Sequence, residues 1–263
     1  MKTRFFTYPL PRLIAHRGFS GRYPENTLMA FQAAVETGVS YLELDVWLSR
    51  DNQLVVHHDD TCQRTCGNPR AIKKMTLSEI KTLDAGFGFS MDGGQTFPFR
   101  GQGITIPSLE EVLTAFPKAF FTIEIKDDSP GIEMVLFDSI RRSGREDAVL
   151  IGSGLDEVMP RIRRHCHGIP TGCSSGEAGA FFFSVQKGET PEMVPGEVLH
   201  LPMYHKGMAL ISPPLVEAAR VMGLEIHVWT VNKKEDMEKL LAQGVAGITS
   251  DFPDLLLEIA GNF

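Results

Sequence analysis

Short apolar runs alternate with amphipathic segments along almost the whole chain. The apolar runs, rich in β-branched and aromatic residues, predict buried strands, and segments with apolar residues every three or four positions predict helices. The predicted strands are 13–16, 41–47, 54–58, 119–125, 148–151, 170–173, 198–201, 225–230 and 247–249. The predicted helices are 27–37, 109–116, 132–142, 155–165, 176–185, 214–222, 234–243 and 253–260.

This alternation is typical of parallel strands joined by right-handed helical crossovers. The number of strands and the length of 263 residues favour an α/β fold of the closed (β/α)8 type, a TIM barrel, over an open doubly wound sheet. No glycine-rich dinucleotide-binding sequence follows the first strand, which also argues against the open sheet. Without a composition shift or a repeat, the chain is predicted to be one domain, 1–263.

One segment, 60–107, interrupts the alternation. It contains a short predicted helix, 77–83, followed by a glycine-rich stretch, and it is too long for an ordinary loop in a compact domain. We therefore expect a small insertion after the second barrel strand, standing over the active-site face. Two roles fit such an insertion: a lid that closes over substrate or a structural cap.

Bulk composition excludes several classes of protein. Hydrophobic content of 43% and charged content of 22% are ordinary for a globular domain. A net charge of −7 argues against nucleic acid and anionic membranes as partners. No apolar run approaches the ~20 residues that span a bilayer, so no stable membrane insertion is expected. The N-terminus lacks the apolar core of a signal peptide, and the expected location is cytoplasmic.

The four cysteines allow two interpretations. Cys62 and Cys66 are close enough in sequence to ligate a metal ion together. The other two, Cys166 and Cys173, do not complete a spacing known from zinc sites. Reduced cysteines in a cytosolic protein are therefore the favoured interpretation.

Three carboxylates lie on the inward faces of two predicted strands. Side chains alternate across a strand, so Glu43 and Asp45 face away from the apolar residues that flank them. The same alternation places Glu124 and Lys126 together on one face. The apolar faces are expected to pack on helices, which leaves the charged faces pointing into the barrel.

Such a cluster requires a positive charge, because unpaired carboxylates in a barrel interior cost several kcal/mol each. Glu43, Asp45 and Glu124 offer an all-oxygen ligand set that suits Mg²⁺ or Ca²⁺ better than zinc. The alternative is a buried salt-bridge network with Arg17 and Lys126. Three inward carboxylates favour the metal.

Two histidines, His16 and His58, end predicted strands beside the acidic cluster. Their positions indicate a general acid and a general base. Asp59 is a candidate to orient His58, whereas His57 faces the other way and is predicted to be structural. Arg17 offers a planar donor fork for phosphate oxygens.

Further positions at strand and helix ends fit more than one role. Trp229, at the end of strand 225–230, fits either a wall against the substrate's carbon skeleton or a core aromatic at the barrel top. His227 lies one layer deeper, where a hydrogen-bonded core role is expected. Asn26 or Thr27 is predicted to cap the helix that follows.

These residues together resemble the glycerophosphodiester phosphodiesterase family. The matching stretches run in family order through nearly the whole chain. They are 16–18 (HRG), 24–27 (PENT), 43–46 (ELDV), Asp51, 54–59 (LVVHHD), 123–126 (IEIK), 228–232 (VWTVN) and 244–253 (GVAGITSDFP). Departures from the family pattern at Cys66, Ala246 and Ser250 leave the proposed catalytic residues intact.

The resemblance implies a phosphatidylinositol-phosphodiesterase-like barrel with an insertion after the second strand. It implies His16 and His58 as the acid–base pair, and Glu43, Asp45 and Glu124 as ligands of one divalent cation. That cation would be Mg²⁺ or Ca²⁺, with Mn²⁺ as a further candidate. Arg17 and Lys126 would lie near the phosphate in the same site.

The resemblance also implies the reaction: hydrolysis of a small glycerophosphodiester to sn-glycerol 3-phosphate and an alcohol. The nucleophile is either water or the glycerol 2-hydroxyl, and similarity to phosphatidylinositol-specific phospholipases favours the second. One alternative is lysophospholipase D activity at the same site. Another is a barrel that binds phosphorylated ligands without catalysis, although such a barrel would usually have lost a histidine or a metal carboxylate. The head group and the oligomeric state are not indicated by the sequence.

Overall fold

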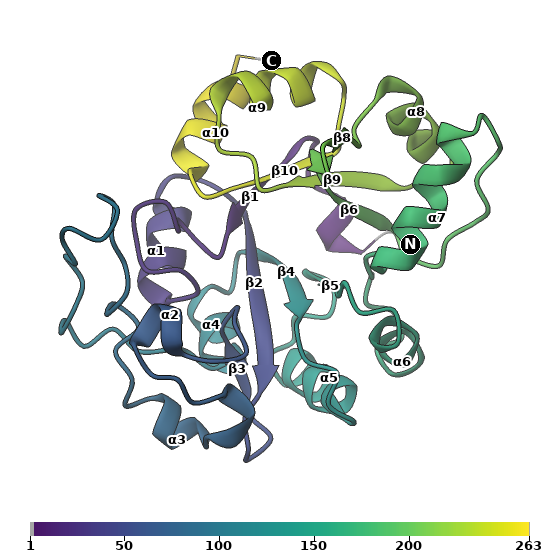
Figure 1. Ribbon diagram of the computed structural model, residues 1–263. Helices are drawn as coiled ribbons and strands as arrows, with labels where there is room; N and C mark the ends of the chain where they lie inside the picture. The colour runs from purple at the N-terminus through teal and green to yellow at the C-terminus, as the bar shows by residue number, and fades with distance from the viewer. Residues whose placement is uncertain (1–2, 263) are drawn as a thin grey trace.

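The structure, a computed structural model, describes residues 3–262; residues 1, 2 and 263, at the ends of the predicted domain, lie outside the described residues. Seven parallel strands form one curled sheet in the order β5-β4-β2-β1-β10-β9-β6 (Figure 1). They are β1 (Arg12–His16), β2 (Tyr41–Leu48), β4 (Phe120–Ile125), β5 (Val149–Gly152), β6 (Val198–Pro202), β9 (Glu225–Trp229) and β10 (Gly247–Ser250). This curled parallel sheet fits a TIM-like barrel.

The two edge strands, β5 and β6, are linked by the segment 170–173. Thr171 forms a parallel bridge with Ile151 of β5, and Gly172 forms one with Val198 of β6. The segment was expected to be a regular strand, but it is extended chain with isolated bridges. These bridges connect the two edges of the sheet, so its hydrogen bonding continues from β5 to β6.

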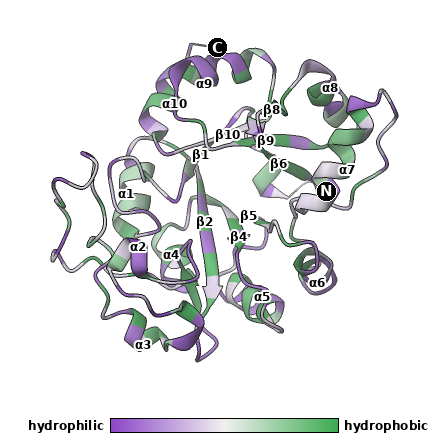
Figure 2. Cartoon of the chain, in the orientation of Figure 1, coloured by the Kyte–Doolittle hydropathy of each residue, from purple (hydrophilic) through white to green (hydrophobic). Residues whose placement is uncertain are grey.

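Helices surround the sheet on its outer side (Figure 1). The longer ones are α1 (Leu28–Glu36), α4 (Leu109–Ala115), α5 (Ile132–Arg142), α6 (Val158–His165), α7 (Ser175–Gln186), α8 (Pro213–Val221), α9 (Lys234–Ala242) and α10 (Pro253–Ala260). Thr27 caps α1, because its side chain accepts a hydrogen bond from the amide of Ala30. Figure 2 shows both hydrophobic and hydrophilic residues on these helices, as expected for elements with one buried face.

The core between sheet and helices follows the predicted alternation. Leu42, Leu44 and Val46 of β2 are fully buried and belong to one cluster with Phe31 of α1 and Leu136 of α5. Burial of each such side chain contributes about 1.5–3 kcal/mol. The apolar face of β2 is thus fixed against the helices, and Glu43 and Asp45 must point into the barrel.

The predicted strand 54–58 is not a barrel strand. Its ordered part, β3 (Leu54–Val56), pairs antiparallel with β2, and Val56 lies opposite Val46. The expectation of parallel strands is wrong for this run, because only a tight turn with Asn52 at φ +56° connects it to β2. A parallel crossover needs a dozen or more residues.

The segment 60–107 contains short elements and a small core of its own. Its elements are α2 (Gln63–Cys66), the 3-10 turn η2 (Ile72–Lys74) and α3 (Leu77–Ile80), which is shorter than the predicted helix. Cys62, Ile72 and Ile106 are among the residues that form a buried cluster against Val55 of β3. Figure 1 shows these elements gathered beside β2 and α1.

The remaining elements are the 3-10 turn η1 (Arg4–Phe6) and the hairpin β7 (Tyr204–His205) with β8 (Met208–Ala209), which follows β6. The four cysteines are free and buried. Within residues 3–262, none of the helices has the length and apolar character required to cross a bilayer.

Candidate active site

A pocket opens where the parallel strands end, at the carboxyl face of the barrel. This is the face on which TIM-barrel enzymes carry their active sites. Seven of the eight side chains predicted to form the site line the pocket: His16, Arg17, Glu43, His58, Glu124, Lys126 and Trp229. The eighth, Asp45, is only 1% exposed and contacts two of them, Arg17 and Lys126.

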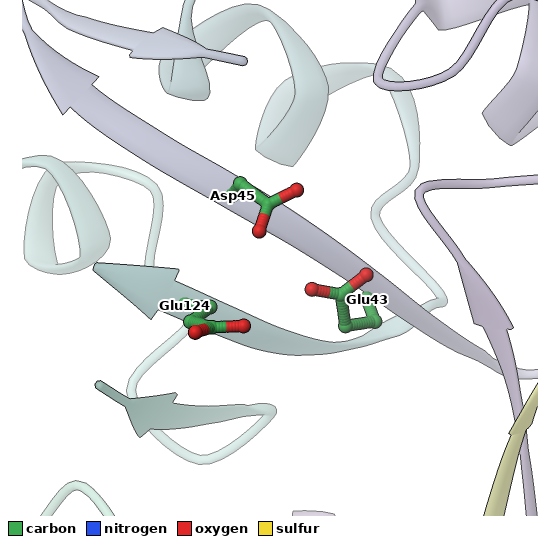
Figure 3. A group of neighbouring side chains, drawn as sticks. All are labelled: Glu43, Asp45 and Glu124. Carbon is green, nitrogen blue, oxygen red and sulfur yellow. The ribbon is translucent and has the colours of Figure 1, made fainter. Parts of the chain in front are cut away.

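The three predicted carboxylates meet on neighbouring strands. Glu43 and Asp45 come from β2, and Glu124 comes from β4, directly opposite Asp45 in the strand register. One oxygen of each carboxylate lies within 4.8 Å of the others. Figure 3 shows the three groups facing one shared space. Alternation turns the three side chains inward, and the pairing of β2 with β4 brings them together.

The predicted salt-bridge partners are also present. Arg17 Nε lies 3.1 Å from one oxygen of Asp45, and Lys126 Nζ lies 3.2 Å from the other. Lys126 also contacts Glu124 at 2.8 Å. Burial lowers the pKa of Lys126, but Asp45 and Glu124 outweigh burial and the pKa is raised, so the ammonium stays charged.

These two cations do not neutralise the whole cluster. Glu43 is 7% exposed, and its Oε2 accepts a hydrogen bond from the amide of Arg17 at 3.0 Å. Burial, and then the charge of Asp45, raise the pKa of Glu43 to about 8. One oxygen of Asp45 accepts no hydrogen bond of good geometry. Buried carboxylates with unused oxygen lone pairs are what a hard divalent cation requires, so the residues present fit a metal ion.

A tight backbone turn places Arg17 beside Asp45. Arg17 has φ +55° and Asn26 has φ +57°, and the amide of Asn26 donates to the carbonyl of Arg17 at 3.0 Å. The Asn26 side chain donates to Asp45 at 2.9 Å. Left-handed backbone at a non-glycine residue is costly, and these hydrogen bonds hold it. Asn26 thus serves the site, whereas Thr27 caps the helix.

His16 is held by a carboxylate that the sequence reasoning did not single out. His16 Nδ1 lies 2.7 Å from Asp251, directly after β10, and its Nε2 lies 4.0 Å from Glu43. Asn232 and Ser20 donate to Asp251 at 2.6 and 2.7 Å. Burial by itself lowers the pKa of His16, but the bond with Asp251 and the charge of Glu43 outweigh it and raise this pKa.

His58 has the same kind of partner. Its Nδ1 lies 2.7 Å from the carboxylate of Asp59, the residue that the sequence placed beside it. With Nδ1 bonded to a carboxylate, Nε2 is the nitrogen left to exchange a proton. His57 instead bonds the carbonyl of Asp59 and the hydroxyl of Thr65, both at 2.8 Å. The structural role predicted for His57 fits these contacts.

The remaining predicted residue, Trp229, ends β9 and is 46% exposed at the pocket rim.

Three further charged side chains belong to the site and were not predicted: Glu25, Arg64 and Asp251. Asp251 had a signal in the sequence, since it is an acidic residue directly after an apolar strand, as Asp45 and Glu124 are near their strand ends. Glu25 and Arg64 lie in loops and a short helix, where no periodicity indicates direction.

Replacing Asp251 with asparagine is expected to lower the pKa of His16 and to reduce kcat/KM at least ~10-fold, because an orienting carboxylate fixes the imidazole tautomer. The substitution removes the contact with Asp251, the largest of the effects that raise this pKa, so the pKa changes downward. If His16 acts as the base, the acid limb of the pH profile moves to lower pH. An NMR titration of His16 and the pH profile of kcat/KM measure these effects.

Asp254→Asn is the control for Asp251→Asn, since Asp254 lies three residues further on and pairs with Arg22 at the surface. An Asp251→Asn enzyme with the pKa of His16 and the activity of the Asp254→Asn enzyme would contradict the orienting role.

One pocket at the mouth of a TIM-like barrel thus combines a cluster of three carboxylates, two histidine–aspartate pairs and the cationic side chains of Arg17 and Lys126. This combination defines a class: a barrel enzyme equipped for acid–base chemistry on a phosphate ester.

Comparison with known proteins gives the family. The sequence model of the Glycerophosphoryl diester phosphodiesterase family matches residues 16–142 and 176–255. The glycerophosphodiester phosphodiesterase of Caldanaerobacter subterraneus subsp. tengcongensis is 35% identical over 252 residues, covering 94% of this chain and 96% of that protein. The chain therefore belongs to the glycerophosphoryl diester phosphodiesterase family, and it is an enzyme of that class, a phosphoric diester hydrolase.

Two more relatives bear on substrate. A phosphodiesterase structure from Oleispira antarctica, in complex with the product sn-glycerol-3-phosphate, superposes with a TM-score of 0.77 at 26% identity, covering 96% of this chain and 97% of that chain. Lysophospholipase D GDPD1 of Homo sapiens is 26% identical over 278 residues, covering 97% of this chain and 87% of that protein.

Proposed function

We propose that this enzyme hydrolyses glycerophosphodiesters to sn-glycerol 3-phosphate and an alcohol by histidine acid–base catalysis at a divalent-cation site. The main observation behind this proposal is that Glu43, Asp45 and Glu124 lie together with two histidines, each of which is bonded through Nδ1 to an aspartate. The product bound to the Oleispira antarctica relative supports the substrate class.

The ligands of the cation in this proposal are Glu43, Asp45 and Glu124. When bound, a Mg²⁺, Ca²⁺ or Mn²⁺ ion supplies Lewis-acid polarisation of a phosphate oxygen. Arg17 and Lys126 add fixed positive charge beside the same position, because both line the pocket and both contact Asp45. A preorganised set of charges stabilises the negative charge that develops on the phosphoryl group.

Proton transfer is assigned to the two histidines. We assign His16 as the base that deprotonates the nucleophile and His58 as the acid that protonates the leaving alkoxide. In each ring Nδ1 is bonded to a carboxylate, so Nε2 carries the transferred proton. The nucleophile is either water or the glycerol 2-hydroxyl, and the second gives a cyclic phosphate intermediate.

The substrate's surroundings are proposed as follows. Trp229 packs against the carbon skeleton of the substrate at the rim. The segment 60–107 is an insertion over the active-site face, as a lid or as a structural cap, since His58 and Asp59 lead directly into it. The partner is a small molecule, and a cytoplasmic location is supported by four free, buried cysteines.

A second candidate activity is lysophospholipase D at the same site. Tyr204 and Met208, in the hairpin that follows β6, are 54% and 47% exposed. Pro202 at the end of β6 is the register partner of Trp229, so the hairpin begins beside that exposed tryptophan. These apolar side chains near the pocket rim offer surface for an acyl chain. The Homo sapiens relative is named as a lysophospholipase D.

A panel of glycerophosphodiesters and lysophospholipids, assayed with Mg²⁺, Ca²⁺ and Mn²⁺ in turn, tests the proposal. We expect release of sn-glycerol 3-phosphate from glycerophosphocholine or another member of the first group. Faster turnover of lysophospholipids, reduced by Tyr204→Ser with Met208→Ser, would favour the second activity. No turnover of either group with any of the three ions would contradict both.

A further inference from the structure

Arg64 of α2 contacts two carboxylates of the active site, Asp59 beside His58 and Glu25 beside Arg17. Its guanidinium donates to Asp59 at 2.8 and 3.1 Å and to Glu25 at 2.6 and 2.8 Å. We propose that Arg64 is a positioning residue that, through Asp59, orients His58 and, through Glu25, holds Arg17. The kinetic consequence rests on the proposed function, whereas the structural consequence for His58 does not.

On one side, Arg64 fixes the carboxylate that contacts His58. Asp59 Oδ1 accepts from His58 and from Arg64, and Oδ2 accepts from Arg64 Nε. Burial raises the pKa of Asp59, but Arg64 and His58 lower it to about 2. The carboxylate is therefore charged and held by two nitrogens of one rigid fork, which leaves it one orientation toward His58 Nδ1.

On the other side, Arg64 fixes the partner of Arg17. Glu25 Oε1 accepts both from Arg17 Nη1 at 3.0 Å and from Arg64 Nη2. Arg17 in turn lies 3.1 Å from Asp45. A continuous chain of charged contacts thus runs from His58 through Asp59, Arg64, Glu25 and Arg17 to Asp45. Within this chain, the pair Glu25–Arg64 connects the barrel with α2.

Close packing of the loop around Gly88 fixes the backbone from which the Arg64 side chain extends. A Cβ on Gly88 would lie 2.1 Å from the carbonyl oxygen of Arg64, and the amide of Gly88 donates to Thr65 at 2.9 Å. Helix α2 ends after Cys66 at Gly67, which has φ +67°. The loop around Gly88 therefore packs directly on α2, and the guanidinium leaves from a defined point of the backbone.

A role in folding stability alone does not account for this arrangement. The Arg64 side chain is 50% exposed, so solvent screens its ion pairs and reduces their contribution to the stability of the fold. Arg64 also does not line the pocket, so it acts on the reaction through Asp59 and Glu25. Its value lies in geometry and charge together, because lysine keeps the charge but cannot reproduce a bidentate fork to two carboxylates.

Kinetics of Arg64→Gln, Arg64→Lys and Arg70→Gln on glycerophosphocholine with Mg²⁺ test the proposal. Arg70 is the matched control: it lies in the same segment, is 47% exposed and pairs with Glu79 at 3.1 Å. We expect kcat to fall ~10-fold or more for Arg64→Gln, since small misplacement of a catalytic group costs as much. KM should change little, Arg64→Lys should recover part of kcat, and Arg70→Gln should match the wild type.

A second measurement reads His58 directly, without turnover. In the wild type, ¹⁵N NMR of the neutral imidazole should show one tautomer with the proton on Nδ1, and Arg64→Gln should show a mixture. If the wild type hydrolyses no diester, the proposed function fails and this measurement still decides the role of Arg64. An Arg64→Gln enzyme with wild-type kcat, or with an unchanged His58 tautomer while folded by circular dichroism, overturns the inference.

Discussion

Replacement of His16 or of His58 with alanine is expected to lower kcat/KM on glycerophosphocholine by ~10²–10⁴-fold, the usual contribution of a positioned acid or base. Each imidazole is bonded to an aspartate through Nδ1 at 2.7 Å, so alanine removes the proton carrier and leaves the carboxylate behind. Steady-state kinetics at several pH values measure the loss. Each variant should also lose the limb of the pH profile that its histidine supplies.

The matched control is His165→Ala, because His165 is an exposed histidine at the end of α6, far along the chain from both His16 and His58. It should retain the activity of the wild type. A loss of less than ~10-fold for His16→Ala or His58→Ala would remove that histidine from the acid–base pair. Thermal unfolding of each variant separates loss of catalysis from loss of fold.

Removal of the divalent cation with EDTA is expected to lower activity by ~10³-fold or more, since polarisation of a phosphate oxygen is worth several kcal/mol in the transition state. Addition of Mg²⁺, Ca²⁺ or Mn²⁺ should restore it and identify the preferred ion. Glu43→Gln should need far more metal for the same activity. Full activity of the metal-stripped enzyme would contradict the assignment of Glu43, Asp45 and Glu124 as ligands.

The metal should also stabilise the protein in a pH-dependent manner. Burial and Asp45 raise the pKa of Glu43 to about 8 in the metal-free site, so the folded state binds a proton that the unfolded state releases near pH 4.5. This proton's contribution to stability is full below about pH 4.5, falls between the two values, and is lost above about pH 8.

Metal must displace that proton. The rise in Tm on adding Mg²⁺ or Ca²⁺ should therefore be larger at pH 8 than at pH 6, and scanning calorimetry measures it. The same rise at both pH values, or the same dependence in Glu43→Gln, would argue against Glu43 as the titrating ligand.

The predicted metal cluster and the histidine pairs differ in how much the sequence could reveal. Strand alternation is a local rule, so the inward direction of Glu43, Asp45 and Glu124 followed from the apolar residues beside them. Asp59 was found because it adjoins His58 in sequence. Asp251 lies far from His16 in sequence, and only the parallel pairing of β1 with β10 brings the two together.

The hairpin β2–β3 shows a limit of the same rule. The apolar run 54–58 has the pattern of a barrel strand, and alternation alone does not give the direction of a strand relative to its neighbour. The tight turn at Asn52 decided it, because the chain between β2 and β3 is too short for a helical crossover. His58 consequently enters the pocket from the segment after β3 and not from the end of a barrel strand.

The sequence by itself determined the barrel class, the alternation of most of its strands with helices, and the inward direction of the three carboxylates. These follow from periodicity, which acts over neighbouring residues and is set by burial of apolar faces. The tertiary structure decided which charges are neighbours: Asp251 with His16, Arg17 and Lys126 with Asp45, and Arg64 between Asp59 and Glu25. Coulombic and hydrogen-bonded contacts depend on distance in space. Loops set those distances, and loop sequences have no periodic pattern from which the distances could be predicted.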